Sequence, residues 1–355
     1  MENLTERSLA GAWNDEREEE FRPWLAKRLT PGRIAAANRE LFRVRTEAGE
    51  VEGRVAGRLR RASLNGEAPF PAVGDWVAAA TGGGAATIQA VLPRRSFFSR
   101  QSAGKSVSEQ VFAANLDFLL IAMALDRDFN PNRLDRYLVM ARRGKVQPAV
   151  ILTKADLAAD AEAHAARMRC ELGEDLPVHA ISTAAGSGLA ALSRYLEPGV
   201  TSLLAGSSGV GKSTLINHLV GKNVAATGAV SAGNGRGRCI TASARMHGTI
   251  TGAFIIDNPG IRELQLWGDE ENLDGAFSEI QALAESCRFR DCRHQGEPGC
   301  AVEAALSSGE LTRQRYLNYV KLKHELCDTA ENAAQMKRAR FKQIAKARRK
   351  MRCDR

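Results

Sequence analysis

One short segment, Gly206 to Thr214, constrains this 355-residue chain more than any other feature. Its letters, Gly-Ser-Ser-Gly-Val-Gly-Lys-Ser-Thr, fit the phosphate-loop pattern G-x-x-x-x-G-K-[ST]. An apolar stretch at 201–205 precedes the loop, and apolar residues at helical spacing follow it from Leu215. The segment therefore predicts a buried strand, a glycine-rich loop and a helix, as in α/β nucleotide-binding domains.

The residue types of this loop suit the phosphates of a nucleotide bound with Mg²⁺. Glycines let successive backbone N–H groups point inward at the positive end of the following helix. Lys212 would reach the β- and γ-phosphates, and the Ser213 hydroxyl would ligate Mg²⁺. We predict nucleotide contacts from the whole loop, which comprises Gly206, Ser207, Ser208, Gly209, Val210, Gly211, Lys212, Ser213 and Thr214.

A second phosphate-site motif, Asp257-Asn258-Pro259-Gly260, ends the apolar stretch at 253–256. A carboxylate at a strand end that faces a phosphate loop can hold Mg²⁺, and Gly260 can donate its N–H to the γ-phosphate. D-x-x-G alone is typical of a turn. Downstream of a phosphate loop and at a strand end, it predicts the Mg²⁺ side of the site.

A base-binding motif, Thr153-Lys154-Ala155-Asp156, follows the apolar stretch at 146–152. The Asp156 carboxylate can accept hydrogen bonds from guanine N1–H and N2–H₂, whereas adenine would leave it unpaired. The stem of Lys154 would lie along the plane of the base. Ser182, which follows the apolar stretch at 178–181, suits a second base-contacting loop.

The order of these motifs along the chain is permuted. Ordinary GTPases have the phosphate loop first and the base loops last, whereas here the base motifs at 153–156 and 182–184 come first. The same ring of loops can form, because ligand position depends on strand ends and not on chain order. From 111 onward, apolar stretches alternate with helical ones, which predicts a parallel sheet with helices on its faces. We predict a circularly permuted α/β GTPase domain.

The remaining segments predict a multidomain chain. Short alternating runs broken by turn residues predict a small OB-like β-barrel, a class that includes nucleic-acid binders and plain structural barrels. The predicted parts are a helical lead-in at 1–32, the OB-fold barrel at 33–92, a linker at 93–110, the GTPase domain at 111–268, and a helical zinc-binding domain with a basic tail at 269–355.

A metal site is predicted from the pattern Cys287-x4-Cys292-x-His294-x5-Cys300. Three thiolates and one imidazole suit tetrahedral Zn²⁺, and a filled set of four protein ligands leaves no open catalytic position. We expect one structural zinc that stabilises a small domain with little core. The total of seven cysteines is odd, which argues against a disulfide framework.

The net charge of +9 is concentrated in one place. Residues 337–355 contain ten Lys and Arg and one acid, so the rest of the chain is neutral. Such a tail is either a solvated basic helix or a segment that docks on a polyanion. The longest apolar run, at 118–125, is too short for a membrane helix, and no secretory signal is visible, so we expect a cytoplasmic protein with no membrane partner.

These features together resemble the RsgA (YjeQ) family of ribosome-small-subunit-dependent GTPases over nearly the full chain, including the barrel segment Val73-Gly74-Asp75-Trp76-Val77. The resemblance implies a bacterial factor that binds GTP and GDP, the 30S subunit and its 16S rRNA. It would act late in 30S maturation, hydrolyse GTP when bound there, and be a monomer. The alternatives are a GTP-gated RNA clamp with little hydrolysis, and an ATPase or kinase, which Lys154 and Asp156 oppose.

The chain departs from the family pattern at three places. The family's Gly-x-Gly-x-His-Thr-Thr is replaced here by a segment with Cys239 at the histidine position and Thr241 as the candidate for Mg²⁺ and γ-phosphate contact. Thr153 replaces the asparagine of Asn-Lys-x-Asp, so a hydroxyl should make the link to the phosphate loop. Asn258 replaces the threonine of the family's Asp-Thr-Pro-Gly. Ile261 stands where many GTPases have a water-positioning glutamine, which is expected of this family. The predicted catalytic set is Lys212, Ser213, Thr241 and Asp257.

Overall fold

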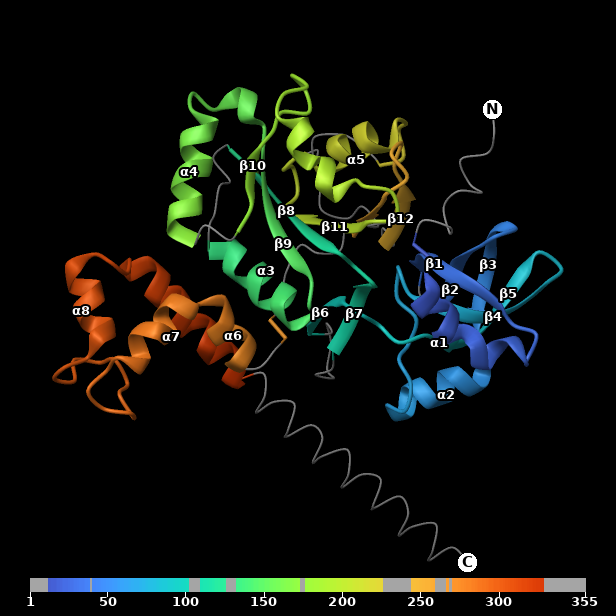
Figure 1. The fold of residues 1–355 in the computed structure, drawn as a ribbon, viewed down its shortest axis with the longest axis horizontal. Helices are drawn as coiled ribbons and strands as arrows, with labels where there is room; N and C mark the ends of the chain where they lie inside the picture. Colours follow the sequence, from blue (N-terminus) through green and yellow to red (C-terminus); the bar gives the residue numbers. More distant parts are fainter. Residues whose placement is uncertain are drawn as a thin grey trace, which may run out of the picture. The chain divides into compact units, whose positions relative to one another are not determined.

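The computed structural model describes residues 12–38, 40–101, 109–125, 132–172, 176–225, 244–258, 266–267 and 270–328. The chain divides into two compact units. Figure 1 shows the fold, with colours that follow the sequence from blue at the N-terminus to red at the C-terminus. The first unit comprises Met1–Phe98, Val111–Asn130 and Gly144–Glu263, and the second comprises Ser99–Gln110, Pro131–Arg143 and Leu264–Arg355.

A closed five-stranded barrel forms the N-terminal part of the first unit. Its strands are β1 (Thr30–Asn38), β2 (Leu41–Thr46), β3 (Gly49–Val55), β4 (Trp76–Gly82) and β5 (Ala85–Val91). They pair in the order β1-β2-β3-β5-β4, and β4 pairs back with β1. Alternate residues of β2 and β5 are buried, as the two-residue period of a strand requires. The predicted OB-like barrel is confirmed.

Two helices accompany the barrel. The first, α1 (Asp15–Leu25), begins at Asn14, whose side chain accepts a hydrogen bond from Arg17 N at 3.1 Å. Its Phe21 packs in a cluster with Trp76 and Leu92. The second, α2 (Gly57–Asn65), connects β3 to β4 and was not expected from the sequence. Only Leu59 of α2 is buried, and the helix lies within the stretch of short runs that was predicted to form strands.

The GTPase part of the first unit is a six-stranded sheet. Its strands are β8 (Phe118–Ala124), β9 (Gln147–Thr153), β10 (Val178–Ala180), β11 (Thr201–Gly206), β12 (Ala244–Gly248) and β13 (Phe254–Asp257), in the order β10-β9-β8-β11-β13-β12. Every pairing is parallel except that of β12 with β13. Strands β8 and β11 are buried almost throughout, which is typical of parallel strands covered on both faces. The connecting elements are α4 (Ala161–Leu172), the 3₁₀ segment η2 (Leu189–Tyr195) and α5 (Lys212–Val220).

The barrel and the GTPase sheet are continuous. Strand β1 pairs antiparallel with β12 through Ala36 opposite Arg245 and Ala37 opposite Ala244. The result is one sheet of 11 strands, and β1 and β12 are its junction (Figure 1). The sequence missed β12, because only Met246 of its five residues is buried and no apolar run marks it.

The second unit is largely helical. Its elements are α3 (Asn132–Arg143), α6 (Glu270–Ala276), α7 (Ser278–Glu285), α8 (Ala301–Ser308) and a helix at 313–328. Ion pairs join α3 to the last helix: Arg136 forms two 2.6 Å bonds with the Glu325 carboxylate, and Arg315 binds Asp135. Strands β6 (Phe97–Gln101) and β7 (Glu109–Ala114) form a separate two-stranded sheet in and beyond the segment predicted as a linker. Among the described residues, no helix is long and apolar enough to cross a bilayer.

The barrel segment 73–77 contains a glycine that its surroundings require. Gly74 has φ +88, and a Cβ there would lie 2.2 Å from the carbonyl oxygen of Ala114. Gly66, at the end of α2, also has positive φ (+78), but a Cβ would meet nothing within 4 Å. The two glycines share a backbone conformation and differ in the space around them.

We therefore predict that Gly74→Ala destabilises the protein more than Gly66→Ala. In Gly66→Ala, the left-handed backbone conformation forced on alanine should by itself lower the free energy of unfolding by about 1 kcal/mol. The added clash should bring the loss in Gly74→Ala to about 3 kcal/mol. Urea unfolding of the two variants measures both, and equal losses would contradict the packing at Ala114.

Candidate functional site

The predicted nucleotide-site residues that the structure describes all follow the carboxyl ends of parallel strands. Thr153 ends β9, Ser182 follows β10, Gly206 ends β11 and Asp257 ends β13. Because these strands are parallel, their carboxyl ends lie at one edge of the sheet, where α/β proteins bind ligands. Thr241 and Gly260, together with Cys239 and Ile261, lie outside the described residues.

The glycines of the phosphate loop are required by its backbone. Gly206 has φ +144, and a Cβ would come 2.3 Å from the carbonyl oxygen of Ala122 on β8. Gly209 and Gly211 have φ +81 and +93, in the left-handed region that other residues rarely adopt. Gly211 is also the N-cap of α5 and makes no side-chain cap bond, so the first N–H groups of this helix can bind an anion.

Lys212 lies across the phosphate loop. Its Nζ donates to the carbonyl oxygens of Gly206 at 2.8 Å and Ser207 at 2.6 Å. Asp257 lies on the neighbouring strand, in register with Leu204. Burial raises the pKa of the Asp257 carboxyl, and the positive charge of Lys212 acts in the opposite direction. The lysine and the carboxylate predicted for the phosphates and for Mg²⁺ are therefore electrostatic neighbours.

The hydroxyl of Thr153 ties the base motif to the phosphate loop. Its Oγ1 donates to the carbonyl oxygen of Val210 at 2.6 Å and is buried. The sequence predicts this link, with threonine in place of the usual asparagine. A buried hydrogen bond of this kind contributes about 1 kcal/mol, enough to fix the loop relative to β9.

The two predicted base-side residues are in contact. Ser182 Oγ donates to Asp156 Oδ1 and accepts from Ala185 N at 3.0 Å. The backbone N–H of Ala155 also donates to Ile181 O at 3.1 Å, so the two loops are held together at two points. Lys154 adopts the left-handed conformation (φ 57), which turns the chain sharply between β9 and Asp156.

The four predicted zinc ligands come together in the second unit. The ligand atoms of Cys287, Cys292, His294 and Cys300 all lie within 4.8 Å of one another. Cys287 Sγ is 3.6 Å from His294 Nδ1 and 3.9 Å from Cys300 Sγ, and His294 Nδ1 is 3.4 Å from Cys300 Sγ. Around tetrahedral zinc, with bonds of about 2.0–2.3 Å, such ligand atoms lie about 3.5–3.8 Å apart. The donor set and its spacing fit one zinc ion.

Two side chains shape the loop that carries these ligands. The Glu297 carboxylate accepts from the backbone N–H groups of Arg293 at 2.9 Å and Gln295 at 2.6 Å, which lowers its pKa. Tyr316 Oη donates to the carbonyl oxygen of His294 at 3.3 Å. Glu297 belongs to the Glu297-Pro298-Gly299 segment in which the chain resembles the family's zinc segment, whereas no sequence pattern marks Tyr316, because its contact depends on the folded loop.

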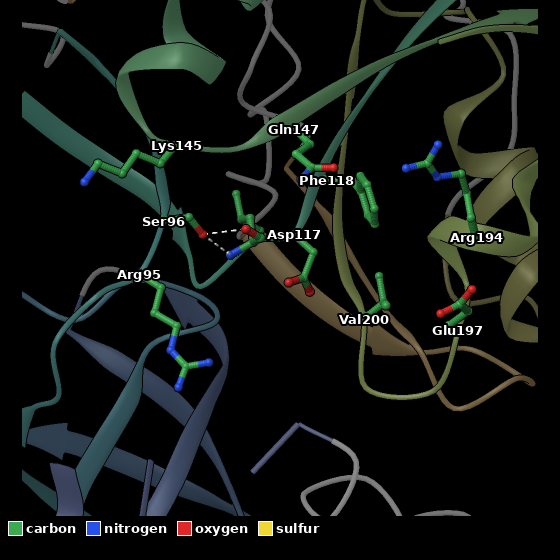
Figure 2. Close-up of a pocket in the computed structure, with 10 residues that line it drawn as sticks. Arg95, Ser96, Asp117, Phe118, Lys145, Gln147, Arg194, Glu197 and Val200 are labelled. Carbon is green, nitrogen blue, oxygen red and sulfur yellow. Dashed lines mark hydrogen bonds between the residues drawn. The ribbon is translucent and has the colours of Figure 1, made fainter. Parts of the chain in front are cut away.

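A cavity of about 520 Å³ lies at the opposite edge of the GTPase sheet. Figure 2 shows its lining, which includes Asp117 and Phe118 at the start of β8, Gln147 at the start of β9 and Arg194 on η2. The Arg194 guanidinium lies 5.6 Å from the centre of the Phe118 ring. No predicted nucleotide-site residue lines this cavity, so it is distinct from that site.

Comparison with known proteins gives a consistent result. A sequence profile described as RsgA GTPase matches residues 91–267. A protein of Opitutus terrae named small ribosomal subunit biogenesis GTPase RsgA is 42% identical over 347 residues, with 94% of each chain covered. A protein of the same name from Xanthomonas euvesicatoria pv. vesicatoria is 41% identical over 313 residues, with 85% of each covered.

Two solved structures share the fold. YjeQ from Thermotoga maritima superposes with a TM-score of 0.61 and 26% identity, covering 84% of this chain and 99% of its own. YloQ, described as a circularly permuted GTPase, superposes with a TM-score of 0.59 and 25% identity, covering 84% of this chain and 96% of its own. The permuted GTPase fold expected from the motif order is confirmed.

The zinc site makes a direct prediction. Cys292→Ser should reduce bound zinc from about one ion per chain to nearly none and unfold the second unit, because three ligands hold the ion poorly. GTP binding should remain. Elemental analysis and nucleotide titration measure the two effects, with Cys327→Ser, an exposed cysteine outside the cluster, as the matched control. If elemental analysis finds no zinc in freshly purified wild-type protein, the site is refuted.

Proposed function

This chain belongs to the RsgA family of small ribosomal subunit biogenesis GTPases, and from that membership we propose that it binds the 30S subunit and assists its late maturation. It is a GTPase of ribosome biogenesis. In the proposed cycle it binds GTP, engages the 30S subunit and its 16S rRNA, hydrolyses GTP to GDP and phosphate there, and leaves.

One observation carries the nucleotide part of the proposal. The loops that follow β9, β10, β11 and β13 converge at one sheet edge, with Ser182 bonded to Asp156 and Thr153 bonded to Val210. Guanine would bind Asp156, with Lys154 along the plane of the base. The phosphates would lie on the N–H groups of the phosphate loop, where Lys212 would exchange its two carbonyl partners for phosphate oxygens.

Mg²⁺ would be held by Ser213 and Asp257 and would supply charge neutralisation at the phosphates. Protein groups would do the rest. Lys212 would stabilise the charge that develops on the γ-phosphate, and Thr241 and Gly260 would complete that side of the site. The raised pKa of Asp257 means that its free carboxyl takes up a proton at a higher pH than usual, so cation binding should weaken as the pH falls.

Among the groups that GTP hydrolysis requires, this chain has the weakest candidates for positioning the attacking water. Ile261 offers no hydrogen bond, and the Cys239 thiol is a weak donor compared with an imidazole. We therefore propose that the free enzyme is slow and that the 30S subunit completes the site, by ordering the loop at 223–242 or by supplying an rRNA group.

Contacts with the subunit are proposed for both ends of the chain. The barrel has a surface cavity of about 370 Å³ whose lining includes Arg54 and the Phe70 ring, which is 42% exposed. The lining also includes Glu40, which pairs with Arg60. An exposed aromatic ring in a cavity that also contains arginine suits an unpaired nucleotide base. The basic tail at 337–355 carries the whole net charge and would bind phosphates of the rRNA. We propose a cytoplasmic monomer.

Guanine selectivity tests the base site. Asp156→Asn should weaken GTP and GDP binding about 100-fold, because an amide donor would then face the guanine donors. The same variant should gain affinity for xanthosine nucleotides, whose 2-oxygen accepts that donor. Titration with fluorescent GDP, XDP and ADP measures the change, and wild-type affinity for ATP equal to that for GTP would refute the assignment.

Single-turnover hydrolysis with and without purified 30S subunits tests the function. We expect the wild-type rate to rise at least tenfold with subunits and Lys212→Ala to lose about 100-fold of that rate. Lys222→Ala, an exposed lysine just beyond α5, should behave as wild type. Cys239→Ala should change little, and Cys239→His should raise the rate. GTP-dependent 30S binding with no stimulation would instead support the clamp.

A further inference from the structure

Arg33 on barrel strand β1 is a buried cation with unusual surroundings. Its side chain is among the largest in the protein that are fully buried, and its Nη2 donates to Thr201 Oγ1 at 2.8 Å. Nε donates to the carbonyl oxygen of Gly74 at 3.3 Å. Burial lowers the pKa of Arg33 to about 10, so the group is still charged at neutral pH.

The environment of Arg33 is costly for a charge. In the described part of the chain it forms no ion pair with a carboxylate, and its buried Nη1 has no hydrogen-bond partner. Its guanidinium instead lies 5.1 Å from the Trp76 ring centre and 5.0 Å from the Phe254 ring centre. Replacing a buried charge by a well-packed apolar side chain is often neutral or stabilising, so fold stability gives no strong reason for an arginine at this position.

What the arginine adds is a connection between the barrel and the phosphate site. Thr201 is the first residue of β11, which ends in the phosphate loop. Phe254 is the first residue of β13, which ends at Asp257. Through Arg33 the barrel therefore contacts the starts of both strands that carry the predicted phosphate and Mg²⁺ groups.

The backbone of β1 contacts a third strand of the site. Ala37 pairs with Ala244, the first residue of β12, and Ala36 pairs with Arg245. Arg245 lies opposite Asp257 in the pairing of β12 with β13. Strand β1 thus runs from the amino ends of β11 and β13, at Arg33, to the level of Asp257, at Ala36.

We propose that Arg33 is a positioning residue for GTP hydrolysis, which fixes β11 and β13 to the barrel so that RNA bound on the barrel alters the geometry of the phosphate loop and Asp257. The inference rests on the proposed function for the identity of the barrel's ligand. The mechanical connection itself does not depend on the proposed function. It requires only that nucleotide binding at the phosphate loop change the exchange behaviour of β1.

The first experiment measures that connection without ribosomes. Hydrogen–deuterium exchange of the full chain is followed with and without a non-hydrolysable GTP analogue. In the wild type, the analogue should slow exchange at 201–206 and also, by about fivefold or more, at 30–38. In Thr201→Val, which removes only the acceptor hydroxyl, slowing should remain at 201–206 and disappear at 30–38.

The matched control is Thr46→Val. Thr46 is a buried barrel threonine whose hydroxyl donates to Gly49 O at 3.0 Å within the barrel. It should keep the wild-type response at both segments. A wild type that shows slowing at 201–206 and none at 30–38 would overturn the inference, whereas no response at 201–206 would instead overturn the nucleotide site itself.

The second experiment measures hydrolysis with saturating 30S subunits. Thr201→Val and Arg33→Met should each lower kcat about five- to tenfold with less than a twofold change in KM, and Thr46→Val should stay within twofold of wild type. The double variant should be no slower than the slower single variant, because both remove one connection. The positioning role would be refuted if the loss of kcat in the double variant equalled the product of the two single losses. It would also be refuted if Thr201→Val kept the wild-type kcat. A melting curve checks whether Arg33→Met folds. If it does not fold, the kcat of Thr201→Val alone tests the positioning role.

Discussion

The parallel pairing of β9, β8, β11 and β13 is the interaction on which the rest of this structure depends. Parallel strands place all their carboxyl ends at one edge of the sheet, so loops that are far apart in the sequence meet there. Asp156, Gly206 and Asp257 lie at this edge for that reason, since each is at or just after the carboxyl end of a parallel strand. The order in which the chain visits the strands does not enter, which explains how a permuted sequence builds the same ring of loops as an ordinary GTPase.

Within that ring of loops, hydrogen bonds from small polar side chains hold the loops to one another. The Thr153 hydroxyl bonds Val210 O at 2.6 Å, and Ser182 bonds Asp156, so the base loops and the phosphate loop are held to one another. Each bond contributes about 1 kcal/mol, which is small for stability and sufficient to select one loop geometry. In the proposed mechanism these bonds support the groups around the phosphates, whereas Ile261 and Cys239, which stand at the positions proposed for the water, have no strong hydrogen-bonding side chain.

The second unit obtains its stability differently. Its helices bury apolar side chains such as Tyr137, Phe277 and Leu322, and ion pairs add to this core. Asp135 of α3 binds Arg315 and Asn318 of the last helix, while Arg136 binds Glu325. The cysteine–histidine cluster, which lies between the end of α7 and the start of α8, would add the binding energy of a metal. Helix α3 thus belongs to this unit by its contacts, although the chain places it between β8 and β9.

The sequence alone determined the features that depend on neighbours along the chain. Phosphate-loop spacing, strand-end acids and the four zinc ligands are local patterns, because glycine conformations, helix starts and metal-ligand spacing are set within a few residues. The tertiary structure decided which distant segments meet: the closing of the barrel, the pairing of β1 with β12, and the burial of Arg33 against Thr201, 168 residues away. No local pattern encodes these contacts. Arg33 looks like any other charged residue of a half-exposed strand until the register of β1 against two other parts of the chain fixes what surrounds it.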